Sequence, residues 1–342
     1  MFIFHTCMKP SVSNYISSLE IHTSINWDSI LQPDDLIITT KTPYEKYPLK
    51  GKAVVISSNK FVEIKTLLDV RHVKRVIGVG GGTAIDVAKT VASKRTLPMI
   101  AIPTILSTNV FSTNKSTIFF DKITSISTTI PNKVIIDLSI LKSSSQRYLL
   151  AGLADIMSIH TASKDWEIAS FVEPINLPLY EISKSLLKSA KLLYPLLKEP
   201  TEFVIQQFVF TLLYAGYITN TYTNGRPESG SEHMVSRAID ELYSDLHILH
   251  GESVLFGILA MSIFQNNEDD FLFEVAKDMT LLKILKENLT KKDLVQSLLY
   301  ASTIRPERFS IFSIKNMNSC MANGIVEKIF KRLENDEDIT FL

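Results

Sequence analysis

Cysteine is scarce in this sequence: Cys7 and Cys320 are the two cysteines among 342 residues, and they lie far apart along the chain. A disulfide framework is therefore not expected, and a reducing, cytoplasmic setting is predicted. Net charge is missing too, because 36 Lys and Arg residues balance 36 Asp and Glu residues. The chain thus has no overall field to attract nucleic acid or an anionic membrane, and an anionic substrate must be bound by local groups.

Long hydrophobic runs are also absent. The best candidate, residues 208–218, contains Thr and Tyr and falls well short of the ~20 residues that cross a membrane. The opening Met1–His5 is too short for a secretory signal and lacks its basic residues. What the chain does have is a hydrophobic fraction of 45%, which over 342 residues is enough for two domains with proper cores.

Short runs rich in valine and isoleucine recur through the first part of the chain and are typical of buried strands in a parallel sheet. They are Leu36–Ile38, Ala53–Ile56, Val76–Val79, Met99–Ile102 and Val134–Ile136. A helix is expected between the third and fourth runs, over 83–94. The alternation predicts an α/β domain with a Rossmann-like parallel sheet over residues 1–145, which binds a dinucleotide.

After Gln146 the pattern changes. Apolar residues recur every three or four positions, as they do on one face of an amphipathic helix. Ile182, Leu186, Ala190, Leu193 and Leu197 are an example. Strand-like runs become rare, so residues 146–342 are predicted to form an all-helical domain.

Three consecutive glycines, Gly80, Gly81 and Gly82, end the third strand run and lead directly into the predicted helix. Without side chains the backbone can approach a ligand closely, and the helix start offers free N–H groups to a phosphate. The spacing matches neither a Gly-x-Gly-x-x-Gly fingerprint nor a Walker loop. We interpret it as a cradle for a dinucleotide diphosphate, although such turns also occur without a ligand. Asp86, on the first turns, would balance the helix dipole in any protein.

Three polar residues stand in distinctive settings. Asp155 follows a small apolar run, whereas His233 and His250 each lie beside Gly and Glu at an expected helix start. One acid and two imidazoles can bind a divalent metal and leave a position open for a ketone or alkoxide oxygen. The structural alternatives are a helix-capping aspartate and two packed histidines. His247 lies three residues before His250 and is expected on the same helix face, either near the substrate or in a structural role.

Together these segments resemble the metal-dependent dehydrogenase superfamily of iron-containing alcohol dehydrogenases, glycerol dehydrogenase and 3-dehydroquinate synthase, and within it the sn-glycerol-1-phosphate dehydrogenase branch. The Ser-Gly-Ser-Glu-His and Lys-Asp-Trp-Glu segments separate this branch from its relatives. The matching segments are Gly80–Lys89, Pro103–Ser107, Ala151–Asp155, Lys164–Glu167, Arg226–His233, Leu249–Glu252 and Arg305–Ile311.

The resemblance implies a dehydroquinate synthase-like fold and a homo-oligomer, because relatives associate as dimers or larger assemblies. It makes Asp155, His233 and His250 the metal ligands, with zinc the usual ion of the branch. The three glycines then lie under the diphosphate of NAD(P). Thr104 and Ser107 border its nicotinamide end.

Two positions depart from the branch. Asn109 stands where an Asp is common, and Ile159 stands where a Lys is common. Both positions are near the substrate in relatives, so the losses indicate either a compensated pair or a changed substrate. Lys115 could supply charge for a phosphate group instead, or be an ordinary surface lysine.

The activity that the resemblance implies is NAD(P)-dependent, metal-dependent reduction of dihydroxyacetone phosphate to sn-glycerol 1-phosphate, a step of archaeal phospholipid synthesis. His247 is one candidate for the proton donor. The alternatives are a related alcohol or polyol dehydrogenase, a sugar-phosphate cyclase, and a catalytically silent nucleotide-binding relative. Ser57–Lys60, after the second strand run, lacks the acid that would favour the NAD ribose, so NAD and NADP both stay open.

Overall fold

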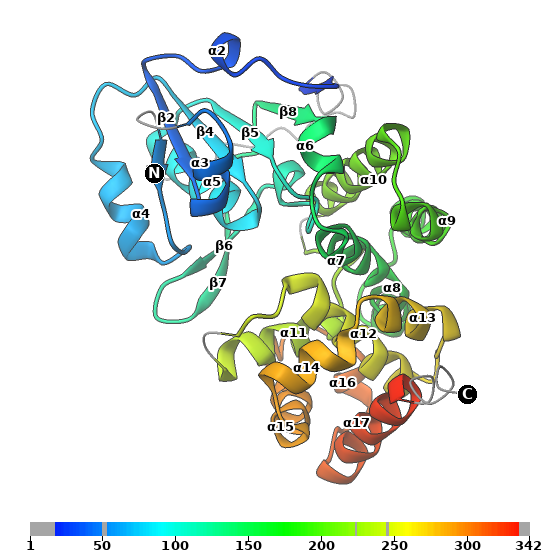
Figure 1. Cartoon of the computed structure of the whole chain (residues 1–342). Coiled ribbons are helices and arrows are strands. Elements are labelled where there is room, and N and C mark those ends of the chain that lie inside the picture. The colour runs from blue at the N-terminus through cyan, green and yellow to red at the C-terminus, as the bar shows by residue number, and fades with distance from the viewer. Residues whose placement is uncertain (1–17, 50–52, 223, 244–245, 335–342) are drawn as a thin grey trace.

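The computed structural model describes residues 18–49, 53–222, 224–243 and 246–334; Met1–His5 and Cys7 lie outside these ranges. Its first part is a six-stranded parallel sheet with the order β1-β8-β5-β4-β2-β3 (Figure 1). The strands are β1 (Leu19–His22), β2 (Asp35–Thr39), β3 (Ala53–Val55), β4 (Arg75–Gly80), β5 (Met99–Pro103) and β8 (Lys133–Asp137). The five predicted strand runs are confirmed. The edge strand β1 is not evident from the sequence, because it is short and half polar.

Side chains of the central strands alternate between two apolar layers, which explains why polar residues in these strands are confined to the strand ends. In β5, Met99 and Ala101 pack with helices α4 (Phe61–Leu68) and α5 (Gly82–Arg95). Ile100 and Ile102 face the opposite layer, which includes residues of α2 (Trp27–Ile30) and α3 (Lys41–Lys46). The helix predicted over 83–94 is α5, and the sheet is covered on both faces as predicted.

The carboxyl ends of β4 and β5 lie side by side. Gly80 pairs with Pro103 in the sheet, and the amide of Thr104 donates to the Gly80 carbonyl at 3.1 Å. The glycine turn and the segment after Pro103 therefore start from the same edge of the sheet. That edge is where parallel α/β sheets bind their ligands.

An antiparallel hairpin, β6 (Lys115–Phe119) and β7 (Ile123–Ser127), extends from the sheet toward the helical part (Figure 1). Its base is held by a buried lysine on α5. The Lys89 ammonium donates to the carbonyls of Val110 at 3.0 Å and Thr113 at 3.3 Å, and it forms an ion pair with Asp86 at 3.2 Å. Asp86 in turn accepts from the Thr117 amide at 3.1 Å.

Replacing Lys89 with methionine is expected to lower the free energy of unfolding by about 2 kcal/mol. The carbonyls of Val110, Thr113 and Lys115 lose this donor, and the buried Asp86 carboxylate loses its cation. Burial already raises the pKa of Asp86, so its carboxyl can take up a proton, which limits the loss. Chemical denaturation measures the change. Lys94→Met, at an exposed position of the same helix, is the matched control and should change stability by less than about 0.5 kcal/mol.

After β8, every element in the described part of the chain is helical, in agreement with the predicted change of pattern. The longer helices are α7 (Gln146–Met157), α8 (Ile159–Ala169), α9 (Leu177–Leu193), α10 (Glu202–Thr221), α11 (Ser231–Leu242), α12 (His250–Gln265), α15 (Lys291–Ala301) and α17 (Ser319–Glu334). Shorter ones are α6 (Leu138–Lys142), α13 (Asp270–Asp278), α14 (Leu281–Asn288), α16 (Ile311–Ile314) and the 3-10 helix Tyr194–Lys198; another 3-10 helix, Val110–Ser112, precedes β6.

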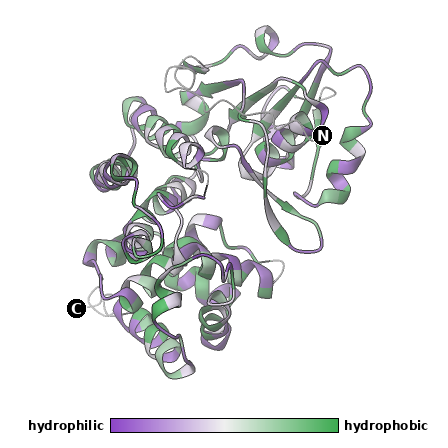
Figure 2. Cartoon of the chain, turned by 180° about the vertical axis from the view of Figure 1, so that it is seen from behind, coloured by the Kyte–Doolittle hydropathy of each residue, from purple (hydrophilic) through white to green (hydrophobic). Residues whose placement is uncertain are grey.

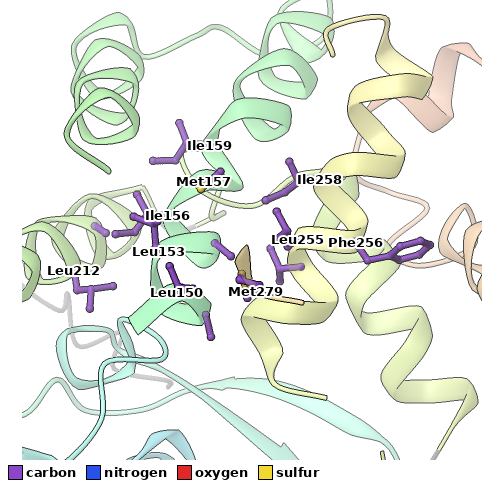
Figure 3. Close-up of a cluster of buried hydrophobic side chains, with 14 of the residues drawn as sticks. Leu150, Leu153, Ile156, Met157, Ile159, Leu212, Leu255, Phe256, Ile258 and Met279 are labelled. Atoms are coloured by element: carbon purple, nitrogen blue, oxygen red, sulfur yellow. The ribbon is translucent and has the colours of Figure 1, made fainter. Parts of the chain in front are cut away.

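Helix α12 lies at the centre of this helical part, and nearly all its residues are buried. Leu255 and Ile258 of α12 share an apolar cluster with Leu153 and Ile156 of α7 and with Leu212 of α10 (Figure 3). The outer helices instead mix hydrophilic and hydrophobic residues, as Figure 2 shows. Within the described residues, no helix is long and apolar enough to span a membrane.

Candidate functional site

Three side chains from three helices meet at one point of the helical part. Asp155 lies in the last turn of α7, His233 in the first turn of α11, and His250 is the first residue of α12. Asp155 is therefore not a helix-capping residue. The C-terminal end of a helix is an unfavourable place for a carboxylate, so Asp155 depends on the two imidazoles beside it.

The donor atoms of these three side chains converge. One carboxylate oxygen of Asp155, Oδ1, lies 3.4 Å from Nε2 of His233 and 3.5 Å from Nε2 of His250. The three atoms all lie within 4.8 Å of one another. Among the described residues, this is the group of His, Cys, Asp and Glu side chains that converges closely enough to hold a metal ion.

Close packing of α7 against α12 brings Asp155 and His250 together. A Cβ on Gly251 would stand 2.0 Å from the backbone oxygen of Ala151, and a Cβ on Gly152 would stand 2.1 Å from that of Leu106. Only glycine at these two positions lets the backbones approach so closely. Gly251 is thus explained by the crossing of α12 and α7, whereas Gly152 is explained by the close packing of α7 against the segment after β5.

Electrostatics in the site favour a bound cation. Burial alone would raise the pKa of Asp155, but hydrogen bonding and charge from His233 and His250 hold it well below its usual range. Burial opposes the charge on His233, yet Asp155 and Glu232 outweigh it and raise the pKa of His233 to about 9. The pKa of Glu232 is lowered, despite its burial, by the same His233. Two ionised carboxylates therefore flank this imidazole.

Glu232 sets the orientation of the His233 ring. Its buried carboxylate lies 2.8 Å from Nδ1 of His233 and accepts from the Thr161 hydroxyl at 2.7 Å. With Nδ1 engaged, Nε2 is the nitrogen left to face Asp155. A carboxylate behind the imidazole is the usual arrangement for a metal-binding histidine.

Asp165, from the Lys164–Glu167 segment, holds the start of α11. Its carboxylate accepts from the amides of Ser231 at 2.5 Å and Ile311 at 2.8 Å. Burial, and then the charge of Glu232, raise the pKa of Asp165 to about 6. The segment from α8 thereby positions the helix turn that carries His233.

The glycine turn has the form expected of an anion cradle. Gly80 has a φ of +146°, a backbone conformation that residues other than glycine rarely adopt. Among the residues that the structure describes, a Cβ on Gly82 would have one atom within 4 Å, the Thr108 hydroxyl oxygen at 3.9 Å, so packing does not require this glycine. No side chain of the described residues caps the first N–H groups of α5, whose N-cap is Gly81. These groups are available to a phosphate.

Other predicted cofactor residues are placed differently. Asp86 directs its carboxylate at Lys89 and the base of β6 instead of at the open start of α5. Thr104 is buried and held to β4 through its backbone, and Ser107 is half-buried in the segment after β5. Their contact with a cofactor stays a prediction.

Asn109 has an acidic partner that the sequence does not reveal. Its amide nitrogen donates to Oε2 of Glu228 at 3.1 Å, and the hydroxyl of Thr219 on α10 donates to the same oxygen. Glu228 lies in the loop before α11 and is buried. Nothing in the local sequence distinguishes it from an ordinary loop residue. The position that departs from the branch thus contacts a carboxyl group from elsewhere in the chain.

Ile159, the other departure from the branch, and two predicted substrate residues, Lys115 and His247, have different surroundings. Ile159 is fully buried in the apolar cluster of Figure 3. Lys115 donates to the Ser127 hydroxyl at 2.9 Å across the hairpin. His247 is exposed and lies outside α12, which begins at His250, so the expectation of a shared helix face is wrong. The His247 amide donates instead to the Asn288 side chain at 2.8 Å.

The segment after β3 contains no acid of its own, but a carboxylate from helix α4 contacts it. Glu63, from α4, accepts from the Ser57 amide at 2.9 Å and from the Ser57 hydroxyl at 2.7 Å. These hydrogen bonds outweigh its partial burial and lower the pKa of Glu63. A negative charge therefore lies beside the residues that follow β3.

Known structures share this fold. The chain superposes on a probable glycerol dehydrogenase from Sinorhizobium meliloti with a TM-score of 0.71, at 16% identity, covering 90% of this chain and 93% of that one. For glycerol dehydrogenase from Schizosaccharomyces pombe the TM-score is 0.66 at 18% identity, over 92% and 88% of the two chains. Residues 50–144 match the family model of iron-containing alcohol dehydrogenase. The chain thus has the fold of glycerol dehydrogenases, and part of it matches the iron-containing alcohol dehydrogenase model.

Sequence relatives narrow the class. The chain is 32% identical over 282 residues to glycerol-1-phosphate dehydrogenase [NAD(P)+] from Pyrococcus horikoshii, covering 79% of each protein. It is 32% identical over 274 residues to the enzyme of the same name from Thermococcus sibiricus, covering 78% of this chain and 77% of that one. The chain therefore belongs to the glycerol-1-phosphate dehydrogenase family, a family of NAD(P)-dependent oxidoreductases.

Proposed function

We propose that this protein interconverts dihydroxyacetone phosphate and sn-glycerol 1-phosphate with NAD(P) and a divalent metal ion, zinc being the first candidate. Residues 1–145 bind the dinucleotide, and residues 146–342 hold the metal and the substrate. The observation that carries the proposal is the convergence of Asp155, His233 and His250 in a chain of this family.

The donor set fits zinc. Ligands about 2.0–2.1 Å from a tetrahedral zinc ion lie about 3.4 Å from one another. The separations of 3.4 and 3.5 Å between Asp155 Oδ1 and the two imidazole nitrogens match this edge length. Three protein ligands leave one position for substrate, and a divalent cation there supplies Lewis-acid chemistry at a ketone oxygen.

The chain's own residues perform the remaining tasks. The uncapped N-terminus of α5 would hold the diphosphate of the dinucleotide, whose nicotinamide would supply the hydride when bound. Glu232 fixes the His233 ring, and Asp165 fixes the turn that carries it. The buried helix crossing at Gly251 keeps Asp155 beside His250.

A substrate panel tests the proposal. The purified protein, supplied with zinc, is assayed with NADH and with NADPH against dihydroxyacetone phosphate, dihydroxyacetone, an aldehyde and a cyclase substrate. We expect net coenzyme oxidation with dihydroxyacetone phosphate above all, and a product that an sn-glycerol-3-phosphate dehydrogenase does not oxidise. Preference for the unphosphorylated ketone would indicate a polyol dehydrogenase instead.

The pKa values predict opposite effects of pH on the metal-free protein and on metal binding. The raised pKa of His233, about 9, means that its protonated form stabilises the metal-free fold below its ordinary pKa. That contribution is lost as the pH rises toward 9. Metal binding needs the neutral imidazole, so zinc affinity should increase over the same range, with release of about one proton at neutral pH. Calorimetry of zinc binding in buffers of different ionisation enthalpy measures the number of protons released per zinc ion. Zinc binding without proton release would contradict this account.

A further inference from the structure

One buried carboxyl group beside the metal-binding residues has a free oxygen. Oε2 of Glu228 is occupied by Asn109 and Thr219, whereas Oε1 is buried and has no hydrogen-bond partner among the described residues. Glu228 as a whole is 8% exposed. A buried polar atom without a partner costs free energy unless a ligand satisfies it.

The backbone of Glu228 is fixed to the turn that carries Asp155. The Ser158 hydroxyl lies 2.6 Å from the carbonyl oxygens of both Asp155 and Glu228. Asn109, from the segment after β5, and Thr219, from α10, fix the side chain from two further directions. Burial raises the pKa of Glu228 to about 8, to which the negative charge of Asp155 also contributes. The carboxyl group is thus rigidly held next to the metal-binding cluster.

We propose that Glu228 is a specificity-determining residue whose Oε1 hydrogen-bonds a hydroxyl group on the carbon next to the substrate carbonyl. The inference rests on the proposed function, which places that carbonyl at the Asp155, His233 and His250 cluster. A hydroxyl can donate to a carboxylate and accept from a carboxylic acid, so it suits Oε1 in either protonation state. A methyl group at the same place would leave Oε1 without a partner.

Two ketones and three variants test this inference. The ketones are dihydroxyacetone phosphate and its analogue with a methyl in place of the hydroxymethyl group. The variants are Glu228→Ala, Glu228→Gln and, as matched control, Glu167→Gln. Glu167 is a half-buried carboxylate on α8 whose partners are Tyr180 and Lys164. Zinc content and thermal unfolding are measured for each protein, and Glu228→Met, which keeps the volume, replaces the alanine variant if that does not fold.

We expect the wild-type protein to prefer the hydroxylated ketone in kcat/KM by about tenfold or more. Glu228→Ala should reduce this ratio about tenfold, chiefly by weakening the reaction of dihydroxyacetone phosphate. Glu228→Gln should keep the ratio within about threefold, because its amide can still donate to the hydroxyl. Glu167→Gln should leave it unchanged.

An unchanged ratio in Glu228→Ala, at wild-type zinc content, would overturn the role of Glu228 and leave the proposed function standing. If the wild-type protein reduced neither ketone, the proposed function would fail, and this inference would fail with it. The two failures are therefore distinguishable from the wild-type rates alone.

Discussion

His250→Ala and His233→Ala are each expected to lose bound zinc and enzymatic turnover while keeping the fold. Loss of an outer partner of a metal ligand already costs about 10–100-fold in affinity, so loss of a ligand should cost more. The Lewis-acid contribution is several kcal/mol, which corresponds to a fall in kcat/KM of about 10³-fold or more. His250 is 42% exposed and His233 20% exposed in their side chains, so truncation leaves little unfilled core.

Zinc per chain, measured by atomic absorption, and kcat/KM with dihydroxyacetone phosphate report the two losses together. The matched control is His160→Asn. His160 lies on α8, and its Nε2 contacts the backbone oxygen of Asn267 at 2.6 Å, apart from the cluster. If either ligand variant kept full activity with normal zinc content, the assignment of the site would be wrong.

The substitution Gly251→Ala, which adds one methyl group, is expected to lower both stability and zinc affinity. Gly251→Ala would place a Cβ 2.0 Å from the oxygen and 2.5 Å from the carbon of the Ala151 carbonyl, and backbone atoms cannot move aside as a flexible side chain can. Helices α7 and α12 must then separate, at a cost above about 3 kcal/mol. Since Asp155 and His250 lie on these two helices, zinc affinity should fall as well.

Gly324→Ala provides the matched control for this change. Gly324 is also helical, on α17, but no atom in the described part of the chain lies within 4 Å of where its Cβ would stand. The alanine should therefore stabilise the protein slightly, by up to about 1 kcal/mol, through helix propensity. Denaturation of both variants gives the comparison. Equal stability would show that α7 and α12 are not packed as closely as the structure has them.

Local patterns explain which parts of the fold could be predicted. The valine and isoleucine runs and the glycine turn are short-range signals, and the structure confirms the strands and α5. The β6–β7 hairpin has no run of valine and isoleucine, because its strands are rich in Ser and Thr. Its base is held by Lys89, a residue of another element. β1 is short and depends on pairing with β8 for its identity.

The sequence predicted which residues belong to the candidate site, but not how they are arranged in space. Asp155, His233 and His250 stood out through their neighbours, and what brings them together is the contact of Gly251 with Ala151, which no spacing in the sequence reveals. His247 was misplaced because periodicity was extended past the real start of α12. Glu228 could not be found from the sequence. Its importance comes from its burial and from its contact with Asn109, which is more than a hundred residues away in the chain.

Anomalous diffraction from crystals of the zinc-loaded protein tests the central claim most directly. The account predicts one strong peak per chain at the zinc edge, about 2.0–2.2 Å from a carboxylate oxygen of Asp155 and from Nε2 of both His233 and His250. A peak at another group of residues, or none in protein that binds zinc in solution, would contradict it.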